Sequence, residues 1–199
     1  MRHLFTCFLF LFFSCNSEDI PSDNEEVKYR ISTHLVSEIQ ENLQVENQFR
    51  DDVALLIDLS ISSNKNRLFV YDVDKDSITH RGLVTHGSCN GTTAPNLAKY
   101  SNIESSYCSS LGKYKIGNAY TGKFGLAFKL HGLDETNDKA FERFIVLHAH
   151  ECVPDLPVNY LICESQGCPT VSTLFLDTLH SIIRKRSEPT LLWIVDDEN

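Results

Sequence analysis

The stretch Ser165-Gln166-Gly167-Cys168-Pro169-Thr170-Val171 stands directly before a helical pattern of apolar residues, and it decides how the second half of the chain folds. Pro189 ends that pattern. We therefore expect Cys168 at the start of a helix, where free backbone N–H groups favour a thiolate and can hold an oxyanion. Gly167 would let a ligand approach the backbone closely. The stretch predicts a reactive cysteine.

An apolar segment ending in a histidine precedes this stretch: Phe144-Ile145-Val146-Leu147-His148-Ala149-His150. A histidine at the end of a buried strand can act as the general base for a cysteine nucleophile. Together, His148 and Cys168 indicate a cysteine acyl-transfer enzyme. His131 and His150 compete with His148 for the role of base, and His131 ranks second because it lies farther from Cys168 along the chain.

The remaining apolar runs predict a mostly-β domain. Short runs bounded by turn residues read as strands, and apolar residues at helical spacing follow Cys168. The expected strands cover residues 53–59, 67–73, 77–86, 112–117, 124–130, 144–148 and 191–195, with a helical turn near 137–141 and a long loop over 88–110. The first three strands read as a meander. The fold class is therefore α+β, with mixed sheets or a sandwich, one main helix after Cys168 and an N-terminal helix.

The N-terminus indicates export. A short basic start precedes an apolar run over 4–13, which is too short for a permanent membrane span and suits a signal peptide. Ser14-Cys15 followed by polar residues is typical of a bacterial lipoprotein signal, with Cys15 lipidated. The expected division is a signal peptide (1–14), an acidic tether (15–26), an N-terminal helix (27–50) and the catalytic domain (51–199).

The cysteine count also carries information. Five cysteines remain in the exported chain apart from Cys15, and an odd number in an oxidising compartment predicts two disulfides and one free thiol. Pairs Cys152–Cys163 and Cys89–Cys108 would each close one loop and leave Cys168 free, although spacing leaves other pairings open. A zinc site of His148, His150 and Cys152 is the alternative by ligand type. We expect disulfides, no metal and no cofactor.

The net charge of −9 excludes the usual nucleic-acid-binding proteins, because contacts with phosphate backbones need clustered Lys and Arg. A papain-like peptidase is disfavoured since those enzymes place the cysteine before the histidine in the chain.

Several motifs follow the order found in one enzyme family. They cover residues 58–60, 64–72, 85–88, 109–117, 129–134 and 191–194, besides His148 and Ser165-x-Gly167-Cys168. With them the chain resembles the murein L,D-transpeptidases (the YkuD-like catalytic domain). The resemblance covers nearly the whole predicted domain. It departs from the commoner motif at Gln166, where a histidine is usual, and at Thr170, where an arginine is usual.

The resemblance implies a role for each matching residue. Cys168 would attack a peptide carbonyl, His148 would take the thiol proton, and the Ala149 carbonyl would orient the imidazole ring. The backbone N–H groups of Gly167 and Cys168 would form the oxyanion hole. The residues expected to line the substrate site are His131, Gly132, Ser165, Gln166 and Thr170.

The implied function is a peptidoglycan L,D-transpeptidase that forms a thioacyl-enzyme with a tetrapeptide stem and passes it to an amine. We expect a monomer in the periplasm, lipid-anchored at Cys15 to the bacterial outer membrane. Two alternatives stay open. One is an L,D-carboxypeptidase with the same Cys/His chemistry, and the other is a non-catalytic, disulfide-stapled lipoprotein that binds the cell wall.

Overall fold

The structure, a computed structural model, describes residues 32–45, 48–91 and 99–196. The predicted signal peptide, Cys15, the tether and the first part of the predicted N-terminal helix lie outside these residues. The elements along the chain are α1 (Thr33–Val45), β1 (Val53–Asp58), β2 (Leu68–Asp72), β3 (Ser77–Gly82), the short helix η1 (Cys89–Gly91), β4 (Gly112–Gly122), β5 (Gly125–Gly132), β6 (Val146–Ala149), β7 (Thr170–Val171), α2 (Thr173–Ile183) and β8 (Leu191–Val195).

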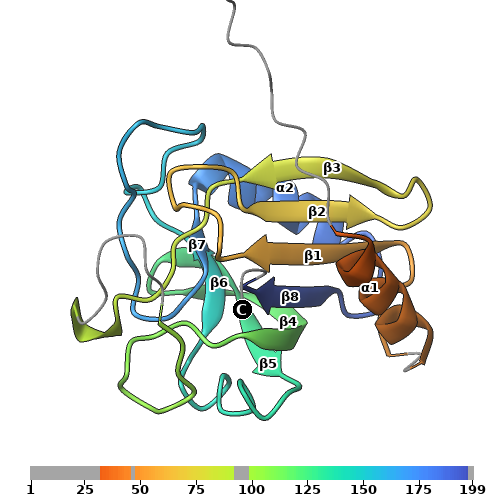
Figure 1. Ribbon diagram of the computed structural model, residues 1–199, viewed down its shortest axis with the longest axis horizontal. Coiled ribbons are helices and arrows are strands. Elements are labelled where there is room, and N and C mark those ends of the chain that lie inside the picture. The colour runs from red at the N-terminus through yellow and green to blue at the C-terminus, as the bar shows by residue number, and fades with distance from the viewer. Residues whose placement is uncertain (1–31, 46–47, 92–98, 197–199) are drawn as a thin grey trace, which may run out of the picture. The chain divides into compact units, whose positions relative to one another are not determined.

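All eight strands belong to one mixed sheet, in the order β3-β2-β1-β8-β4-β5-β6-β7 (Figure 1). The pairs β1–β2 and β2–β3 are antiparallel, which confirms the predicted meander. β8 returns parallel to β1, and β6 pairs in parallel with β7. The mostly-β α+β fold class is confirmed, and the expected mixed sheets form a single sheet of eight strands.

The core explains why the apolar runs became strands. All six residues of β1 are buried, so this strand has covered side chains on both faces. Its odd-numbered residues pack in one cluster with Leu176, Leu179 and Ile183 of α2, which lies behind the sheet in Figure 1. In front of the sheet, α1 buries Leu35, Ile39 and Leu43. The helix thus presents one apolar stripe, as its spacing predicts.

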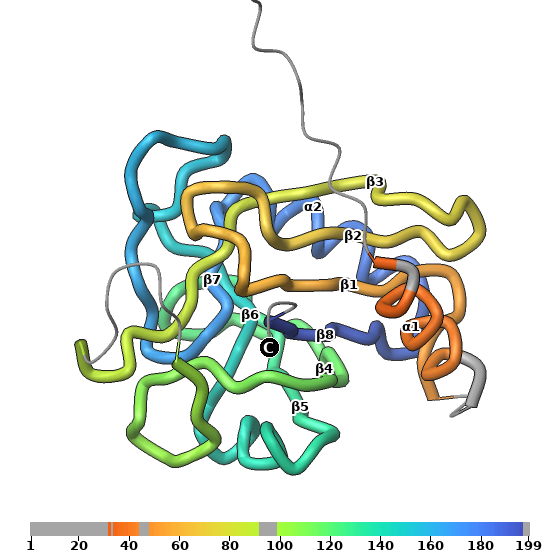
Figure 2. The backbone as a smooth tube through the Cα atoms, in the orientation of Figure 1, coloured from red at the N-terminus to blue at the C-terminus, as the bar shows by residue number. Residues whose placement is uncertain are grey.

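The chain just after β3 bonds to β7, so segments at the two ends of the strand order meet (Figure 2). The Thr85 N–H donates to the Thr170 carbonyl at 2.9 Å, and Gly87 forms a parallel bridge with Ser165. These bonds hold the segment that carries Cys168 against the chain after β3, which lies far away in the sequence.

One expectation about Cys168 is wrong: it does not start a helix. The strand β7 intervenes, and α2 begins only at Thr173, with Ser172 as its N-cap accepting from the Phe175 N–H. The helical conformation is unfavourable for a residue that precedes a proline, as Cys168 does. The β-branched residues Thr170 and Val171 pair with His148 and Ala149 instead. Because the dipole effect falls off within the first turn, α2 contributes little at the thiol.

No helix in the described part of the chain combines the length and apolarity needed to cross a bilayer.

Candidate active site

The sheet brings the predicted base and nucleophile onto neighbouring segments. His148 lies on β6, where it pairs with Thr170 of β7, and Cys168 immediately precedes that strand. The His148 N–H donates to the Pro169 carbonyl at 3.4 Å and the His150 N–H donates to the Val171 carbonyl at 3.1 Å, so the backbone just after Cys168 is bonded to the histidine strand. The spacing of these residues in the sequence is long, but in the fold they occupy adjacent positions.

The Cys168 side chain is half-buried and is the one free cysteine among the described residues. Its Sγ accepts from the Val146 N–H at 3.5 Å and lies 3.7 Å from the Phe144 carbonyl, to which the thiol donates. Burial raises the pKa of the Cys168 thiol, while the Val146 amide and the positive charge of Arg143 act in the opposite direction. The resting group is therefore a thiol that needs a base.

The His148 ring is buried and oriented by its own strand. Its Nδ1 lies 3.0 Å from the Ala149 carbonyl, so Nδ1 carries the proton and Nε2 is left as the basic nitrogen. Burial lowers the pKa of His148, the Ala149 hydrogen bond raises it and nearby His150 lowers it. Nε2 currently faces the Thr170 hydroxyl at 3.2 Å. The hydrogen bonds of the Cys168 thiol are thus with Phe144 and Val146, and none joins it to His148.

The loop that carries Cys168 is fixed by its backbone. The Ser165 hydroxyl accepts from the Gly167 N–H at 3.1 Å and approaches the His86 carbonyl at 3.2 Å. Gly167 has φ +105°, and a Cβ there would lie 2.7 Å from the Cys108 carbonyl. Only glycine fits both the conformation and the space.

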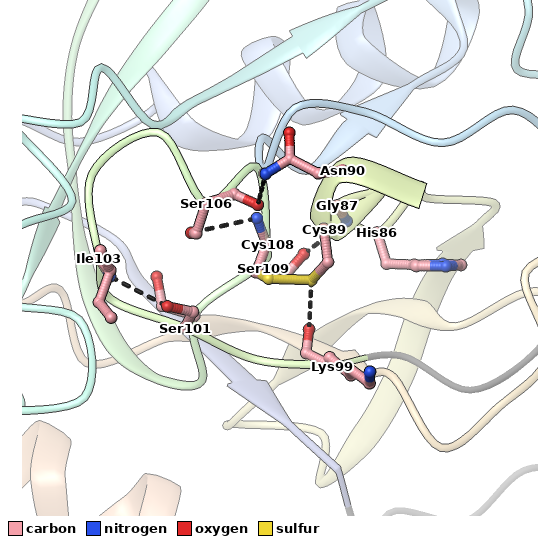
Figure 3. The surroundings of a disulfide bond; sticks show 12 residues. His86, Gly87, Cys89, Asn90, Lys99, Ser101, Ile103, Ser106, Cys108 and Ser109 are labelled. Atoms are coloured by element: carbon pink, nitrogen blue, oxygen red, sulfur yellow. Dashed lines mark hydrogen bonds between the residues drawn. A yellow bond between two sulfur atoms is a disulfide. The ribbon is translucent and has the colours of Figure 1, made fainter. Parts of the chain in front are cut away.

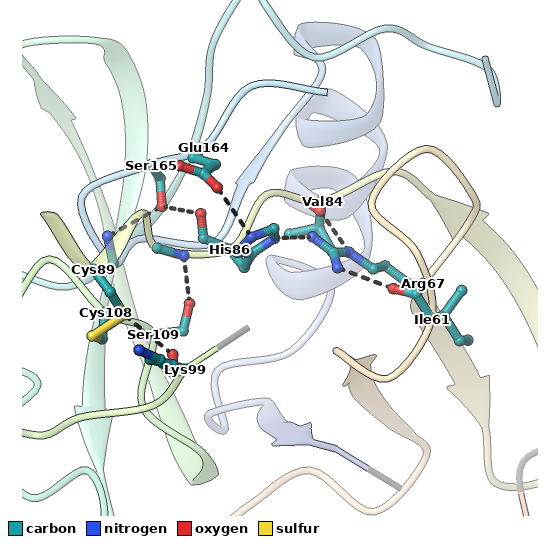
Figure 4. A network of polar contacts seen from close by, with 12 residues as sticks. Ile61, Arg67, Val84, His86, Cys89, Lys99, Cys108, Ser109, Glu164 and Ser165 are labelled. Carbon is teal, nitrogen blue, oxygen red and sulfur yellow. Dashed lines mark hydrogen bonds and ion pairs between the residues drawn. A yellow bond between two sulfur atoms is a disulfide. The ribbon is translucent and has the colours of Figure 1, made fainter. Parts of the chain in front are cut away.

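A buried polar network supports the same loop (Figure 4). The Arg67 guanidinium donates to the carbonyls of Val84 and Ile61 and to the His86 Nδ1, the last at 3.0 Å. On the other side of that ring, Nε2 lies 3.6 Å from the Glu164 carboxylate. Burial and the charge of Arg67 lower the pKa of His86 to about 4, so this ring is neutral and bridges the two charged groups.

Among the described residues two disulfides are formed, Cys89–Cys108 and Cys152–Cys163, which are the pairs that the sequence favours. Figure 3 shows the first, next to Gly87, whose N–H donates to the Ser109 hydroxyl. With Cys152 in a disulfide, the alternative zinc site lacks a ligand. The described residues contain no group of three or more His, Cys, Asp and Glu side chains arranged to hold a metal.

Arg143 ties the loop around Cys108 to the site. Its guanidinium donates to the carbonyls of Ser101 and Cys108 and to the hydroxyls of Ser106 and Ser110. No sequence pattern indicates this role, because the partners of Arg143 lie far away in the chain. Burial lowers the pKa of Arg143, and the group retains its charge beside Cys168.

The other expected site residues are spread over the surrounding structure. His131 stacks on Phe141 of the turn before β6, with 4.8 Å between ring centroids, and pairs with Lys115 on β4. Gly132 packs directly on the Asn137 backbone, where a Cβ would overlap the Asn137 carbonyl, so the turn requires a residue without a side chain. Gln166 is exposed. Thr170, at the position of the usual arginine, is buried against His148.

Three residues at the site had no sequence prediction. Thr85 accepts from the Thr170 N–H and donates to the Cys168 carbonyl at 3.2 Å. Phe124 stacks on the His148 ring, with 4.9 Å between centroids, and is half-exposed. Phe144 provides the carbonyl that the thiol contacts. Of the three, only Thr85 could have been found from the sequence, because it lies in the family motif over 85–88.

One comparison with known proteins shows a family. The profile of the family described as the L,D-transpeptidase catalytic domain matches residues 23–193. No curated protein matches the chain.

Solved structures with a similar arrangement include three bacterial proteins. The helical cell shape determining protein Pgp2 from Campylobacter jejuni is 13% identical (TM-score 0.46) over 81% of this chain and 55% of its own. Bd1075 from Bdellovibrio bacteriovorus is 19% identical (TM-score 0.46) over 77% and 50%. The L,D-transpeptidase from Xylanimonas cellulosilytica is 16% identical (TM-score 0.39) over 72% and 60%. The chain spans about half the length of the first of these structures.

Proposed function

The chain belongs to the L,D-transpeptidase catalytic domain family, and on that basis we propose that it is a peptidoglycan L,D-transpeptidase with Cys168 as nucleophile and His148 as general base. The observation that carries the proposal is that a free cysteine directly precedes β7, the strand that pairs with the oriented histidine on β6. The Ala149 carbonyl holds Nδ1, so the lone pair of Nε2 remains for the proton of the thiol.

The proposed first half-reaction starts from the neutral pair. The thiol turns from the Phe144 carbonyl toward His148 Nε2, which takes its proton while Sγ attacks the carbonyl of the donor stem peptide. Apo structures often show such hydrogen bonds unformed until substrate binds. The tetrahedral intermediate collapses, its C–N bond breaks, and the imidazolium returns the proton to the leaving amine. A thioester on Cys168 and a free terminal amino acid result.

The oxyanion would be stabilised mainly at Cys168 itself. The Gly167 N–H is donated to Ser165, so it serves the loop in the resting structure. The Cys168 N–H has no hydrogen-bond partner in the described part of the chain. A backbone donor aimed at the developing charge is among the larger electrostatic contributions to acyl transfer.

In the second half-reaction the side-chain amine of another stem attacks the thioester and displaces Sγ, which recovers its proton. The N-terminal features complete the proposal: export by a signal peptide over 1–14, and a lipid anchor on Cys15 that holds the domain at a membrane beside the wall.

The test is a muropeptide assay with wild-type protein, Cys168→Ala, and His80→Ala as a matched control, because His80 is exposed on β3 and has no role in the site. Mass spectrometry of a purified disaccharide tetrapeptide should show a crosslinked dimer that has lost one free terminal amino acid, for wild type and His80→Ala only. Tripeptide without dimer would replace the transpeptidase with the L,D-carboxypeptidase. An unchanged substrate, with wall binding retained, would favour the non-catalytic lipoprotein.

A further inference from the structure

The turn before β6 ends in a conformation that suits glycine, yet the residue there is a phenylalanine. Phe144 has φ +58°. The Ile145 N–H donates to the Ala140 carbonyl at 2.9 Å, and the Phe144 N–H donates to the Phe141 carbonyl at 3.1 Å. These two bonds are those of a Schellman motif with Phe144 at the position that usually holds glycine. Ala140 and Ile145 are both buried in the core, as the motif favours.

The fold gains little from the Phe144 ring. A left-handed conformation is unfavourable for a residue with a Cβ, and Phe144 lacks the short polar side chain that helps Asn or Asp adopt it. Packing does not compensate, because the Phe144 residue is 82% exposed. In the described part of the chain the ring stacks on no other aromatic ring and is no member of a hydrophobic cluster. Strain of this kind is concentrated at functional sites.

The position of Phe144 is at the nucleophile. Its carbonyl accepts from the Cys168 thiol, and the next residue but one, Val146, donates its N–H to the same sulfur. Phe124, which is half-exposed, stacks on His148. A residue with an exposed aromatic side chain therefore contacts each member of the proposed catalytic pair, Phe144 through its carbonyl and Phe124 through its ring.

We propose that Phe144 is a substrate-contact residue, whose exposed ring packs against the aliphatic part of the acyl donor as that donor reaches Cys168. The inference rests on the proposed function and adds to it a specificity-determining side chain. An apolar ring that is exposed in the free protein gains contact area when a ligand covers it. The backbone of the turn needs glycine and the substrate needs the ring, so the two requirements oppose each other at this one residue.

Two substitutions separate these requirements in the full-length protein. Phe144→Gly removes both the ring and the strain, and Phe144→Trp keeps a ring. Ser105→Gly is the matched control, because Ser105 is exposed and also has a left-handed backbone, with φ +60°. For each variant we would measure the urea unfolding midpoint, the rate of Cys168 alkylation by iodoacetamide, and KM and kcat for the tetrapeptide stem.

Phe144→Gly should have an unchanged or higher unfolding midpoint and an unchanged alkylation rate. Its KM should rise about tenfold, the effect of losing roughly half of a buried phenylalanine side chain, with kcat nearly constant. Phe144→Trp should keep the wild-type KM, and so should Ser105→Gly. A lower midpoint in Phe144→Gly would overturn the proposal, since the ring would then be structural. An unchanged KM in that variant would overturn it as well. Absence of turnover by wild type would reject the proposed function and this inference together.

Discussion

Gly167→Ala tests whether the loop before the nucleophile is as constrained as it looks. Gly167 has φ +105°, and an added Cβ would lie 2.7 Å from the Cys108 carbonyl oxygen. That oxygen cannot easily move away, because Arg143 donates to it at 2.7 Å and Cys108 is joined to Cys89. The substitution thus combines an unfavourable backbone conformation with a clash between two fixed backbones.

Gly125→Ala is the matched control, since Gly125 has φ +82° with no atom near the position of a Cβ. An alanine in this left-handed conformation costs about 1–2 kcal/mol, and the smaller conformational freedom of the unfolded chain offsets a few tenths of it. The control should therefore lose about 1 kcal/mol in its free energy of unfolding. Overpacking at Gly167 adds about 1–3 kcal/mol, so Gly167→Ala should lose about 3 kcal/mol. A shift of Cys168 by roughly 1 Å should also slow its acylation about a hundredfold.

The assays are urea unfolding and the rate at which a carbapenem, a reagent that acylates this class of enzyme, adds mass to the protein. Both variants must be compared under non-reducing conditions so that the Cys89–Cys108 disulfide stays intact. Equal stability losses in the two variants, together with wild-type acylation in Gly167→Ala, would refute the reasoning. Such a result would mean that the loop can move without disturbing the nucleophile.

Three further predictions follow from the site. His148→Ala should slow acylation by roughly two to four orders of magnitude with the fold intact, and a larger loss in His131→Ala would transfer the role of base to His131. Replacing Cys152 and Cys163 by serine should lower the free energy of unfolding by about 3 kcal/mol for the 11-residue separation, and an unchanged urea midpoint would contradict this. His86 has a pKa of about 4 in the fold against 6.5 in the unfolded chain, so the unfolded chain binds the proton first as the pH falls. The free energy of unfolding should therefore decrease as the pH is lowered from about 6.5 to 4. His86→Gln should flatten that pH dependence in urea titrations.

The strands that the sequence predicted best are those with continuous apolar runs, such as β1 and β8. β4 is longer than expected. Its second half, after a bulge between Ile116 and Ala119, is largely exposed and has no apolar alternation, so the sequence pattern did not predict it. β7 was missed since two residues carry no periodic signal. What defines β7 is its pairing with β6, which depends on the whole fold.

The residues proposed to carry the chemistry were named from the sequence, whereas the contacts that surround them could not be. His148 and Cys168 have reactive side chains in a recognisable setting. Arg143 acts through carbonyls of a loop more than thirty residues earlier in the chain. Phe144 is notable for its left-handed backbone conformation, which no residue pattern predicts when phenylalanine stands in place of glycine. Contacts of this kind follow only from tertiary structure.

The central claim is that Cys168 forms a thioester with a peptidoglycan stem, and peptide mapping of the acylated protein tests it most directly. Wild-type protein, incubated with a disaccharide tetrapeptide and quenched in acid, should gain the mass of the donor minus that of the free terminal amino acid it releases. That mass should map to the peptide containing Cys168 and should be released by hydroxylamine, as a thioester is. An adduct that persists in Cys168→Ala, or that maps to another residue in wild type, would contradict the account.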